Sequence, residues 1–173
     1  GAAIGNLLLQ AVALGELKGP AYIRINRTDL PVYTDPDAEY HIGKISTIRE
    51  GKDVVVFGSG VMVSQAMAAA EELEKEGISV RVVNISTIKP LDEEALKACC
   101  EGVKGVVTAE EHNIYGGLGS AVCEALSDSR LPIKMVGLQD TFGRSAENYQ
   151  LLLEKYHLMP ADVTAAVKAV LGA

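Results

Sequence analysis

Short apolar runs alternate with longer amphipathic stretches from about residue 41 to the end of the chain. The run at 53–58 is almost wholly apolar, which is typical of a parallel strand that is covered on both faces. The stretch after it repeats apolar positions with a helical period, as Val63, Met67 and Ala70 illustrate. The same reasoning predicts further strands at 78–83, 103–108 and 133–136, and helices that end at 76, begin at 90, span 118–126 and 146–156, and begin at 160. This alternation predicts a doubly wound α/β domain over roughly 41–173.

Residue types at the ends of these helices agree with the assignment. Gly77 is a typical stop signal after the first helix. Acidic residues at 92–94 stand where the positive end of the next helix dipole is expected. We expect Ser145 to cap the helix over 146–156, and Pro160 to begin the last helix.

The first 40 residues have a different character. Residues 1–16 read as an apolar helix without a starting methionine, so we expect a trimmed or partial chain. Residues 21–25 alternate between apolar and other side chains, as a strand does. From residue 26 to about residue 40 the chain is rich in Asp, Pro and Thr, which is typical of a linker. We therefore expect a domain boundary in this region.

Composition narrows the possible functions. The 173 residues include 16 basic and 23 acidic ones, and the net charge of −7 argues against binding to nucleic acid or to an anionic membrane. The three cysteines have no metal-ligand spacing, so we interpret them as small buried hydrophobic residues in a reducing cytosol. Apolar runs are too short for a membrane span, and no signal peptide is visible, so we expect a cytoplasmic protein.

A glycine-rich segment follows the strand predicted at 103–108. Gly116, Gly117 and Gly119 would let backbone amides approach an anion at the start of a helix, although their spacing matches no nucleotide-binding motif. Tight helix–strand packing is the favoured interpretation. The preceding residues 110–112 (Glu-Glu-His) could relay protons. A structural turn, in which the glutamates cap a helix or cross a dimer interface, is favoured there too.

Five segments in order resemble the transketolase family, which uses thiamine diphosphate. The segment 19–31 (Gly-Pro-Ala-Tyr-Ile-Arg-Ile-Asn-Arg-Thr-Asp-Leu-Pro) resembles the end of the pyrimidine-binding domain of transketolases. The segments 51–60, 77–84, 88–92 and 110–120 resemble their C-terminal domain. The resemblance therefore predicts a remnant of the pyrimidine-binding domain with a linker at 1–36, and a transketolase C-terminal domain at 37–173. The expected fold is a mostly parallel five-stranded sheet with helices on both faces.

The resemblance also implies an activity, and it implies which part of the complete enzyme carries the cofactor site. The complete enzyme would transfer a two-carbon ketol unit between sugar phosphates, with thiamine diphosphate and Mg²⁺ as cofactors. In this family the cofactor site is built from parts that precede this chain. We therefore expect no cofactor, no metal and no catalysis in the isolated chain. The expected partners are a second copy in a homodimer, the section or subunit that carries the cofactor site, and sugar phosphates.

Arg27 is the leading candidate for a substrate contact, because it occupies the position at which transketolases grip the substrate phosphate with an arginine. A guanidinium suits a phosphate because its planar fork donates parallel hydrogen bonds. Arg24 is a second candidate, since related deoxyxylulose-phosphate synthases use a nearby arginine. The alternative for Arg27 is a solvated arginine paired with an aspartate of the linker. His41 could approach the active site, but a capping or surface role is favoured, and His157 is interpreted as a surface residue.

Two other functions remain open. The chain could be the matching part of a deoxyxylulose-phosphate synthase or of a 2-oxo-acid dehydrogenase beta subunit, although residues 26–31 (Asn-Arg-Thr-Asp-Leu-Pro) favour transketolase. It could also be a non-catalytic regulatory module that binds a small anion or a nucleotide through the glycine loop at 116–120.

Overall fold

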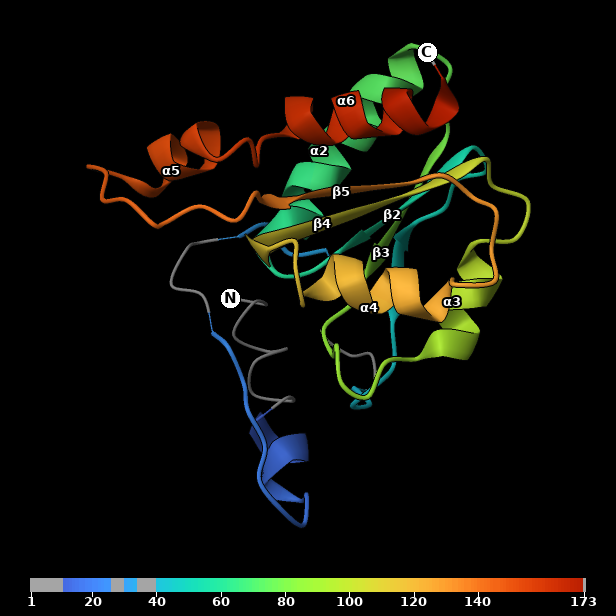
Figure 1. Cartoon of the computed structure of the whole chain (residues 1–173). Coiled ribbons are helices and arrows are strands. Elements are labelled where there is room, and N and C mark those ends of the chain that lie inside the picture. Colours follow the sequence, from blue (N-terminus) through green and yellow to red (C-terminus); the bar gives the residue numbers. More distant parts are fainter. Residues whose placement is uncertain (1–10, 26–29, 34–39, 173) are drawn as a thin grey trace.

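A computed structural model describes residues 11–25, 30–33 and 40–172 (Figure 1). Its five strands are β1 (Ser46–Arg49), β2 (Val54–Gly58), β3 (Val80–Asn84), β4 (Gly105–Asn113) and β5 (Ile133–Leu138). Its helices are α2 (Val61–Lys75), α3 (Glu93–Cys99), α4 (Leu118–Ala125), α5 (Tyr149–Lys155) and α6 (Pro160–Leu171). Residues 11–15 are also helical.

The strands form one sheet in the order β1-β3-β2-β4-β5. Among the described strands, the pairs β3–β2, β2–β4 and β4–β5 are parallel, and the pair β1–β3 is antiparallel. The predicted fold class, a mostly parallel five-stranded sheet with helices on both faces, is therefore confirmed. The sequence analysis did not predict strand β1. Its sequence, Ser-Thr-Ile-Arg, has no apolar run, because an edge strand is paired on one side and half-exposed.

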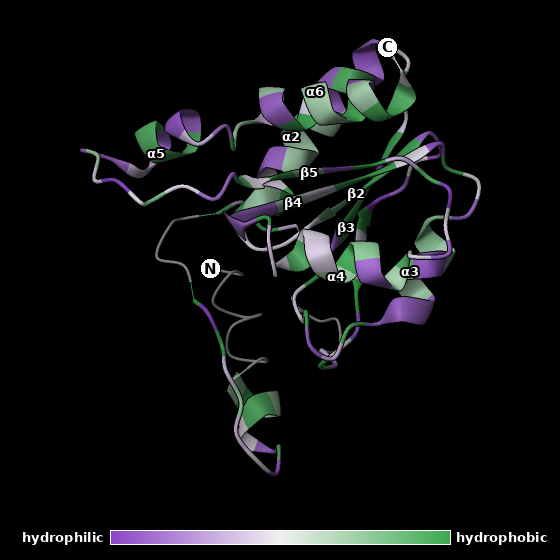
Figure 2. Cartoon of the chain, viewed as in Figure 1, coloured by the Kyte–Doolittle hydropathy of each residue, from purple (hydrophilic) through white to green (hydrophobic). Residues whose placement is uncertain are grey.

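Successive residues of the central strand face opposite layers of the domain. Val54 and Val56 belong to the apolar cluster that α2 and α6 cover, whereas Val55 and Phe57 belong to the cluster beneath α3 and α4. This is the two-residue period of a strand, and here both faces are buried. The uninterrupted apolar run at 54–57 is the consequence (Figure 2).

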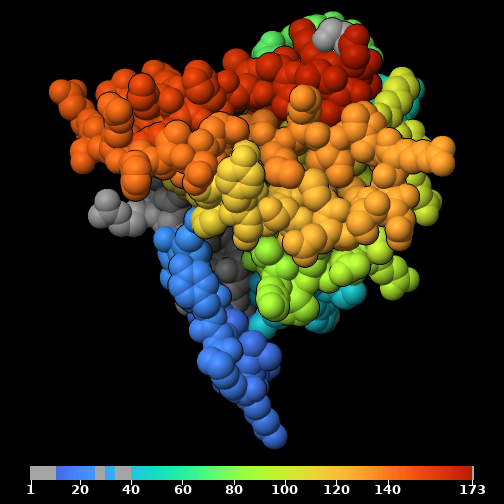
Figure 3. All heavy atoms as spheres, viewed as in Figure 1, coloured from blue at the N-terminus to red at the C-terminus, as the bar shows by residue number. Residues whose placement is uncertain are grey.

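The N-terminal segment departs from the prediction. Residues 21–25 form no strand, and Tyr22 is 87% exposed. A strand needs a neighbour to pair with its backbone, and in the described part of the chain no strand pairs with this segment. Figure 3 shows the described N-terminal residues, in blue, extending away from the body of the domain.

Two helices begin later than predicted: α3 starts at Glu93 rather than at 90, with Asp92 as its N-cap, and α5 starts at Tyr149 rather than at 146. The N-cap of α5 is Asn148, whose side-chain oxygen accepts a hydrogen bond from the Leu151 amide at 3.0 Å. Ser145 lies in the exposed segment before the helix, so its predicted capping role is wrong. Asn and Ser are comparable N-caps, so the cap is decided by position: it is the residue directly before the first turn of the helix. Helix α6 begins at Pro160, as predicted.

Candidate functional site

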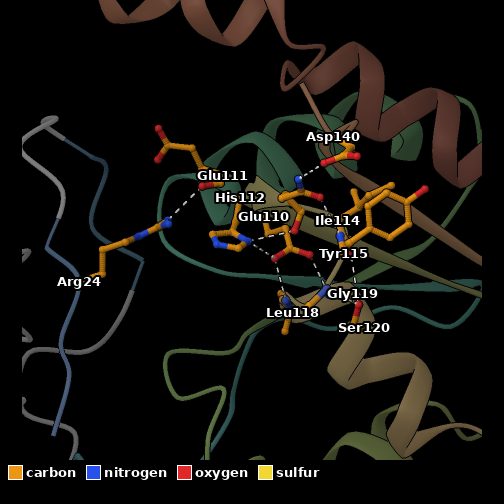
Figure 4. A network of polar contacts seen from close by, with 12 residues as sticks. Arg24, Glu110, Glu111, His112, Ile114, Tyr115, Leu118, Gly119, Ser120 and Asp140 are labelled. Carbon is orange, nitrogen blue, oxygen red and sulfur yellow. Dashed lines mark hydrogen bonds and ion pairs between the residues drawn. The ribbon is translucent and has the colours of Figure 1, made fainter. Parts of the chain in front are cut away.

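The carboxyl end of strand β4 carries a dense network of polar contacts (Figure 4). At its centre is Glu110, whose side chain is 2% exposed. Its Oε2 accepts a hydrogen bond from the Leu118 amide at 2.7 Å, and its Oε1 accepts one from the Gly119 amide at 2.7 Å. Both amides lie at the start of helix α4, where the helix dipole favours negative charge. Glu110 is therefore a helix cap, in agreement with the favoured interpretation.

The glycines of this loop make room for that carboxylate. A Cβ at Gly117 would overlap Glu110 Oε2, although the extended backbone there would accept alanine. A Cβ at Gly119 would stand 2.7 Å from Met135 Sδ and 2.9 Å from Thr108 Oγ1. These contacts confirm tight helix–strand packing. They also remove the support for an anion-binding loop at 116–120, because the first amides of α4 already hold an anion that belongs to the chain.

Strand β4 bulges at Glu110, Glu111 and His112, which we call the β4 bulge. Ala109 pairs with Val136, and Asn113 pairs with Leu138, so these three residues of β4 stand opposite a single residue of β5, Gly137. A Cβ at Gly137 would lie 2.9 Å from the His112 carbonyl oxygen. A bulge leaves backbone groups outside the ladder and turns the strand locally. Here it makes the Glu111 carbonyl available to another part of the chain.

Arg24 donates a hydrogen bond to the Glu111 carbonyl. The donor is its Nη2, which lies 3.2 Å from the Glu111 backbone oxygen, in an exposed position at the end of the sheet. One such bond uses one of the five N–H donors of a guanidinium. Arg27, the other predicted substrate contact, lies outside the described residues. The structure thus brings Arg24 and the β4 bulge together across 87 positions of sequence, a contact that no local pattern could indicate.

The turn between β4 and α4 is held by side chains that the sequence analysis did not single out. Asn113 Nδ2 donates to Asp140 Oδ1 at 3.1 Å, and Asn113 Oδ1 accepts from the Tyr115 amide at 2.9 Å. Ser120 Oγ accepts from the Gly116 amide at 2.8 Å and donates to the Ile114 carbonyl at 3.1 Å. Asn and Ser are common in turns, but their partners are fixed only by the packing of β5 and α4.

The histidines do not form a shared centre. His112 is 53% exposed, and its Nδ1 lies 2.9 Å from the Asn113 carbonyl oxygen and 4.0 Å from Glu110 Oε2. Because both oxygens of Glu110 already accept backbone amides, this geometry favours a structural role over a proton relay. His41 is exposed, as predicted. His157 is exposed as well, and its Nδ1 lies 3.5 Å from Asp162 Oδ1.

The cysteines and a surface pocket are not part of the polar network at the carboxyl end of β4. The three cysteines are free thiols, and burial raises the pKa of Cys100 to about 11. A pocket of about 290 Å³ lies between α3 and the segment 125–131, at the opposite end of the sheet from Arg24. Among the described residues, no group of three or more His, Cys, Asp or Glu side chains is placed to hold a metal ion. Within the same residues, no helix combines the length and apolar character that a membrane crossing requires.

Comparison with known proteins gives consistent results. Residues 43–163 match the family model for the transketolase C-terminal domain. A 6-deoxy-6-sulfo-D-fructose transketolase subunit of a Clostridium species is 39% identical over 153 residues, which are 88% of this chain and 47% of the relative. A putative transketolase C-terminal section of Methanocaldococcus jannaschii is 38% identical over 156 residues, with 88% and 48% covered. A 1-deoxy-D-xylulose-5-phosphate synthase of Bacillus velezensis is 36% identical over 164 residues, or 92% of this chain and 26% of the enzyme.

A solved structure extends the similarity to three dimensions. It is described as a split gene transketolase, inactive beta4 tetramer, and it matches with a TM-score of 0.86 and 43% identity over 95% of this chain and 55% of that chain. The chain spans about half the length of the first two relatives described above. A family model that covers residues 43–163, with relatives above 30% identity, establishes the classification. The chain belongs to the transketolase family and carries a transketolase C-terminal domain.

Proposed function

We propose that this chain is the C-terminal portion of a thiamine-diphosphate-dependent transketolase that transfers a two-carbon ketol unit between sugar phosphates. Two similar proteins are named as a transketolase subunit and as a C-terminal section, and the chain covers about half of each. In this proposal residues 1–36 belong to the end of the pyrimidine-binding domain and its linker, and residues 37–173 form the C-terminal domain. The complete enzyme works in the cytoplasm, to which free cysteines are suited.

The cofactor belongs to another part of the complete enzyme. The described residues do not fit thiamine diphosphate or Mg²⁺. The amides that begin α4 already bind the buried Glu110 carboxylate, which would repel a diphosphate, and the described residues provide no cluster of metal ligands. We therefore derive no chemical step through the cofactor from this chain. Its own contribution is to contact the substrate phosphate and to support the interface with its partners, and the chain alone is inactive.

The observation that carries the proposal is the position of Arg24. Its guanidinium lies at the carboxyl end of the parallel strands, where ligands of open α/β sheets bind. A guanidinium offers a phosphate two parallel donors and retains its charge at every physiological pH. In this proposal Arg27 is the principal phosphate contact, and Arg24 assists it.

Exposed aromatic residues at the same end support an interface. Tyr115, directly after β4, is 69% exposed, and Phe142, in the segment after β5, is 97% exposed. Aromatic residues are enriched in protein–protein interfaces relative to the rest of the surface. In the proposed assembly the section that carries the cofactor site covers this end, and two copies of the assembly form the dimer.

The test uses the complete enzyme, reconstituted from this chain and the section that carries the cofactor site. Arg27→Ala and Arg24→Ala should each raise KM for a phosphorylated ketose, by about tenfold or more at Arg27, because a charge-assisted contact is lost. KM for an unphosphorylated ketose should stay within twofold. Arg130→Ala, an exposed arginine at the far end of the sheet, is the matched control. Equal losses with both substrates would exclude a phosphate contact.

The same assay separates the second candidate. The similarity to a 1-deoxy-D-xylulose-5-phosphate synthase extends over 92% of this chain, so the complete enzyme could instead perform that reaction. The two are distinguished by their products, since the synthase is named for forming 1-deoxy-D-xylulose 5-phosphate. Formation of that product with no ketol transfer between sugar phosphates would overturn the proposed ketol transfer.

A further inference from the structure

We infer that Glu110 is a positioning residue for Arg24: by binding the start of helix α4, it fixes the β4 bulge, whose Glu111 carbonyl holds the guanidinium. The inference rests on the proposed phosphate contact of Arg24 and assigns a role to a residue that touches no substrate. Figure 4 shows the arrangement, with Arg24 on one side of the bulge and the amides of α4 on the other.

The β4 bulge is held from helix α4. In the registers of the sheet, β2 pairs with β4 only as far as Ala109, and β5 resumes pairing at Asn113. Residues 110–112 therefore have no one-to-one register with β5, since the three of them stand opposite Gly137 alone. The buried side chain of Glu110 accepts two hydrogen bonds of 2.7 Å, from the backbone amides of Leu118 and Gly119. Because these amides belong to a helix packed on the sheet, they tie the bulge to a rigid element.

Glu110 is directly adjacent to the residue that accepts the Arg24 hydrogen bond. The Glu111 carbonyl belongs to the residue directly after Glu110, so a change in the backbone at Glu110 moves the acceptor of the Arg24 bond. Gly137 of β5 limits where the bulge can go, because a Cβ there would lie 3.3 Å from Glu110 Cγ and 2.9 Å from the His112 oxygen. The bulge is thus packed from β5 and tied from α4. Arg24 receives a fixed acceptor.

The kinetic test uses the complete enzyme with the variants Arg24→Ala, Glu110→Gln, Glu110→Asp and the double variant of Arg24→Ala with Glu110→Gln. Glutamine retains the shape but presents an N–H₂ group to an N–H donor, and aspartate retains the charge but shortens the reach. We expect Glu110→Gln to raise KM for a phosphorylated ketose about fivefold or more, with little change in kcat. The double variant should be no worse than Arg24→Ala, since both changes remove one contact. Glu124→Gln, an exposed glutamate of α4, is the control.

A second readout needs no catalysis. Trypsin cleaves after Arg24 and after Lys18, which lies on the same segment, and the ratio of the two rates reports how firmly the guanidinium is held. In native protein, Glu110→Gln and Glu110→Asp should raise the Arg24 to Lys18 cleavage ratio several-fold, whereas Glu124→Gln should leave it unchanged. An unchanged ratio in both Glu110 variants would overturn the inference. So would KM effects that multiply in the double variant, or equal losses with phosphorylated and unphosphorylated ketoses.

The two proposals fail in different ways. If the reconstituted wild-type enzyme transfers no ketol unit, the proposed function is wrong, and the cleavage ratio still tests whether Glu110 positions Arg24. If Arg24→Ala raises KM for phosphorylated ketoses and the Glu110 variants do not, the phosphate contact stands and the positioning role is wrong.

Discussion

Two adjacent glycines before helix α4 offer a direct test of how the Glu110 cap is built. Gly117 has an extended backbone that alanine adopts freely, but a methyl group there would overlap Glu110 Oε2 and would stand 2.8 Å from the Asn113 carbonyl oxygen. Gly116 has the opposite character: its φ of 75° is unfavourable for alanine, and no atom lies within 4 Å of an added Cβ. Gly117→Ala therefore tests the carboxylate contact, and Gly116→Ala tests backbone strain alone.

The structure sets the magnitude of each change. In Gly117→Ala the carboxylate of Glu110 must move away from the amides of Leu118 and Gly119, both of which are buried. Two hydrogen bonds to a charged group contribute about 1.5–3 kcal/mol each, so the free energy of unfolding should fall by about 3–6 kcal/mol. A left-handed conformation at a non-glycine residue costs about 1–2 kcal/mol, which is the loss expected for Gly116→Ala.

The assay is urea denaturation of the purified chain, followed by far-UV circular dichroism at one fixed protein concentration, because association would shift the midpoint. We expect the order wild type, Gly116→Ala, Gly117→Ala in decreasing stability. A Gly117→Ala variant as stable as Gly116→Ala would refute the reasoning, since it would mean that the carboxylate contributes little. A Glu110→Ala background provides the internal check, because removing the carboxylate should remove most of the additional loss at Gly117.

Two further predictions concern single ionisable groups. Burial raises the pKa of Cys100 to about 11, compared with an ordinary 9.0. Native Cys100 at pH 8 should therefore react with iodoacetamide about a hundredfold more slowly than a peptide thiol. Peptide mass spectrometry measures this rate, and a rate equal to that of the unfolded chain would contradict the prediction. Hydrogen bonds from Lys104 Nζ (2.8 Å) and then from the Ser79 amide (2.9 Å) lower the pKa of Asp53 below its ordinary 3.8. The stabilisation is therefore present above about pH 4 and is lost as the pH falls through the lowered pKa. Asp53→Asn should be less stable than wild type in urea titrations at pH 7, with a gap that narrows below pH 4; a gap that does not change with pH would exclude this origin.

The sequence predicted the fully buried elements well, and it predicted poorly the features that depend on contacts between residues far apart in the chain. The apolar run at 54–57 predicted β2 because both faces of a central parallel strand are covered. Strand β1 carries no such signal, since it is half-exposed at the edge. The alternation at 21–25 suggested a strand, but alternation describes side chains and does not supply the neighbour that backbone pairing requires.

In the candidate site, too, local features were predicted and contacts between distant residues were not. The glycines at 116–119 and the acids at 110–111 indicated a close approach and a helix cap, and the structure confirms both through Glu110. Which acid makes the cap depends on the bulge in β4, and the bulge depends on the register against β5. The contact between Arg24 and Glu111 depends on the path of a segment that lies 87 residues earlier. Arg27 remains a prediction.

The carboxylate at the start of α4 differs from a captured ion in one thermodynamic respect. A bound phosphate is exchangeable, so its occupancy falls on dilution and with competing salt. Glu110 is joined to the chain eight residues before Leu118, and its local concentration is set by that tether alone. The Glu110 contact therefore does not weaken on dilution, and the entropy of ordering this loop is lost during folding rather than on binding a ligand.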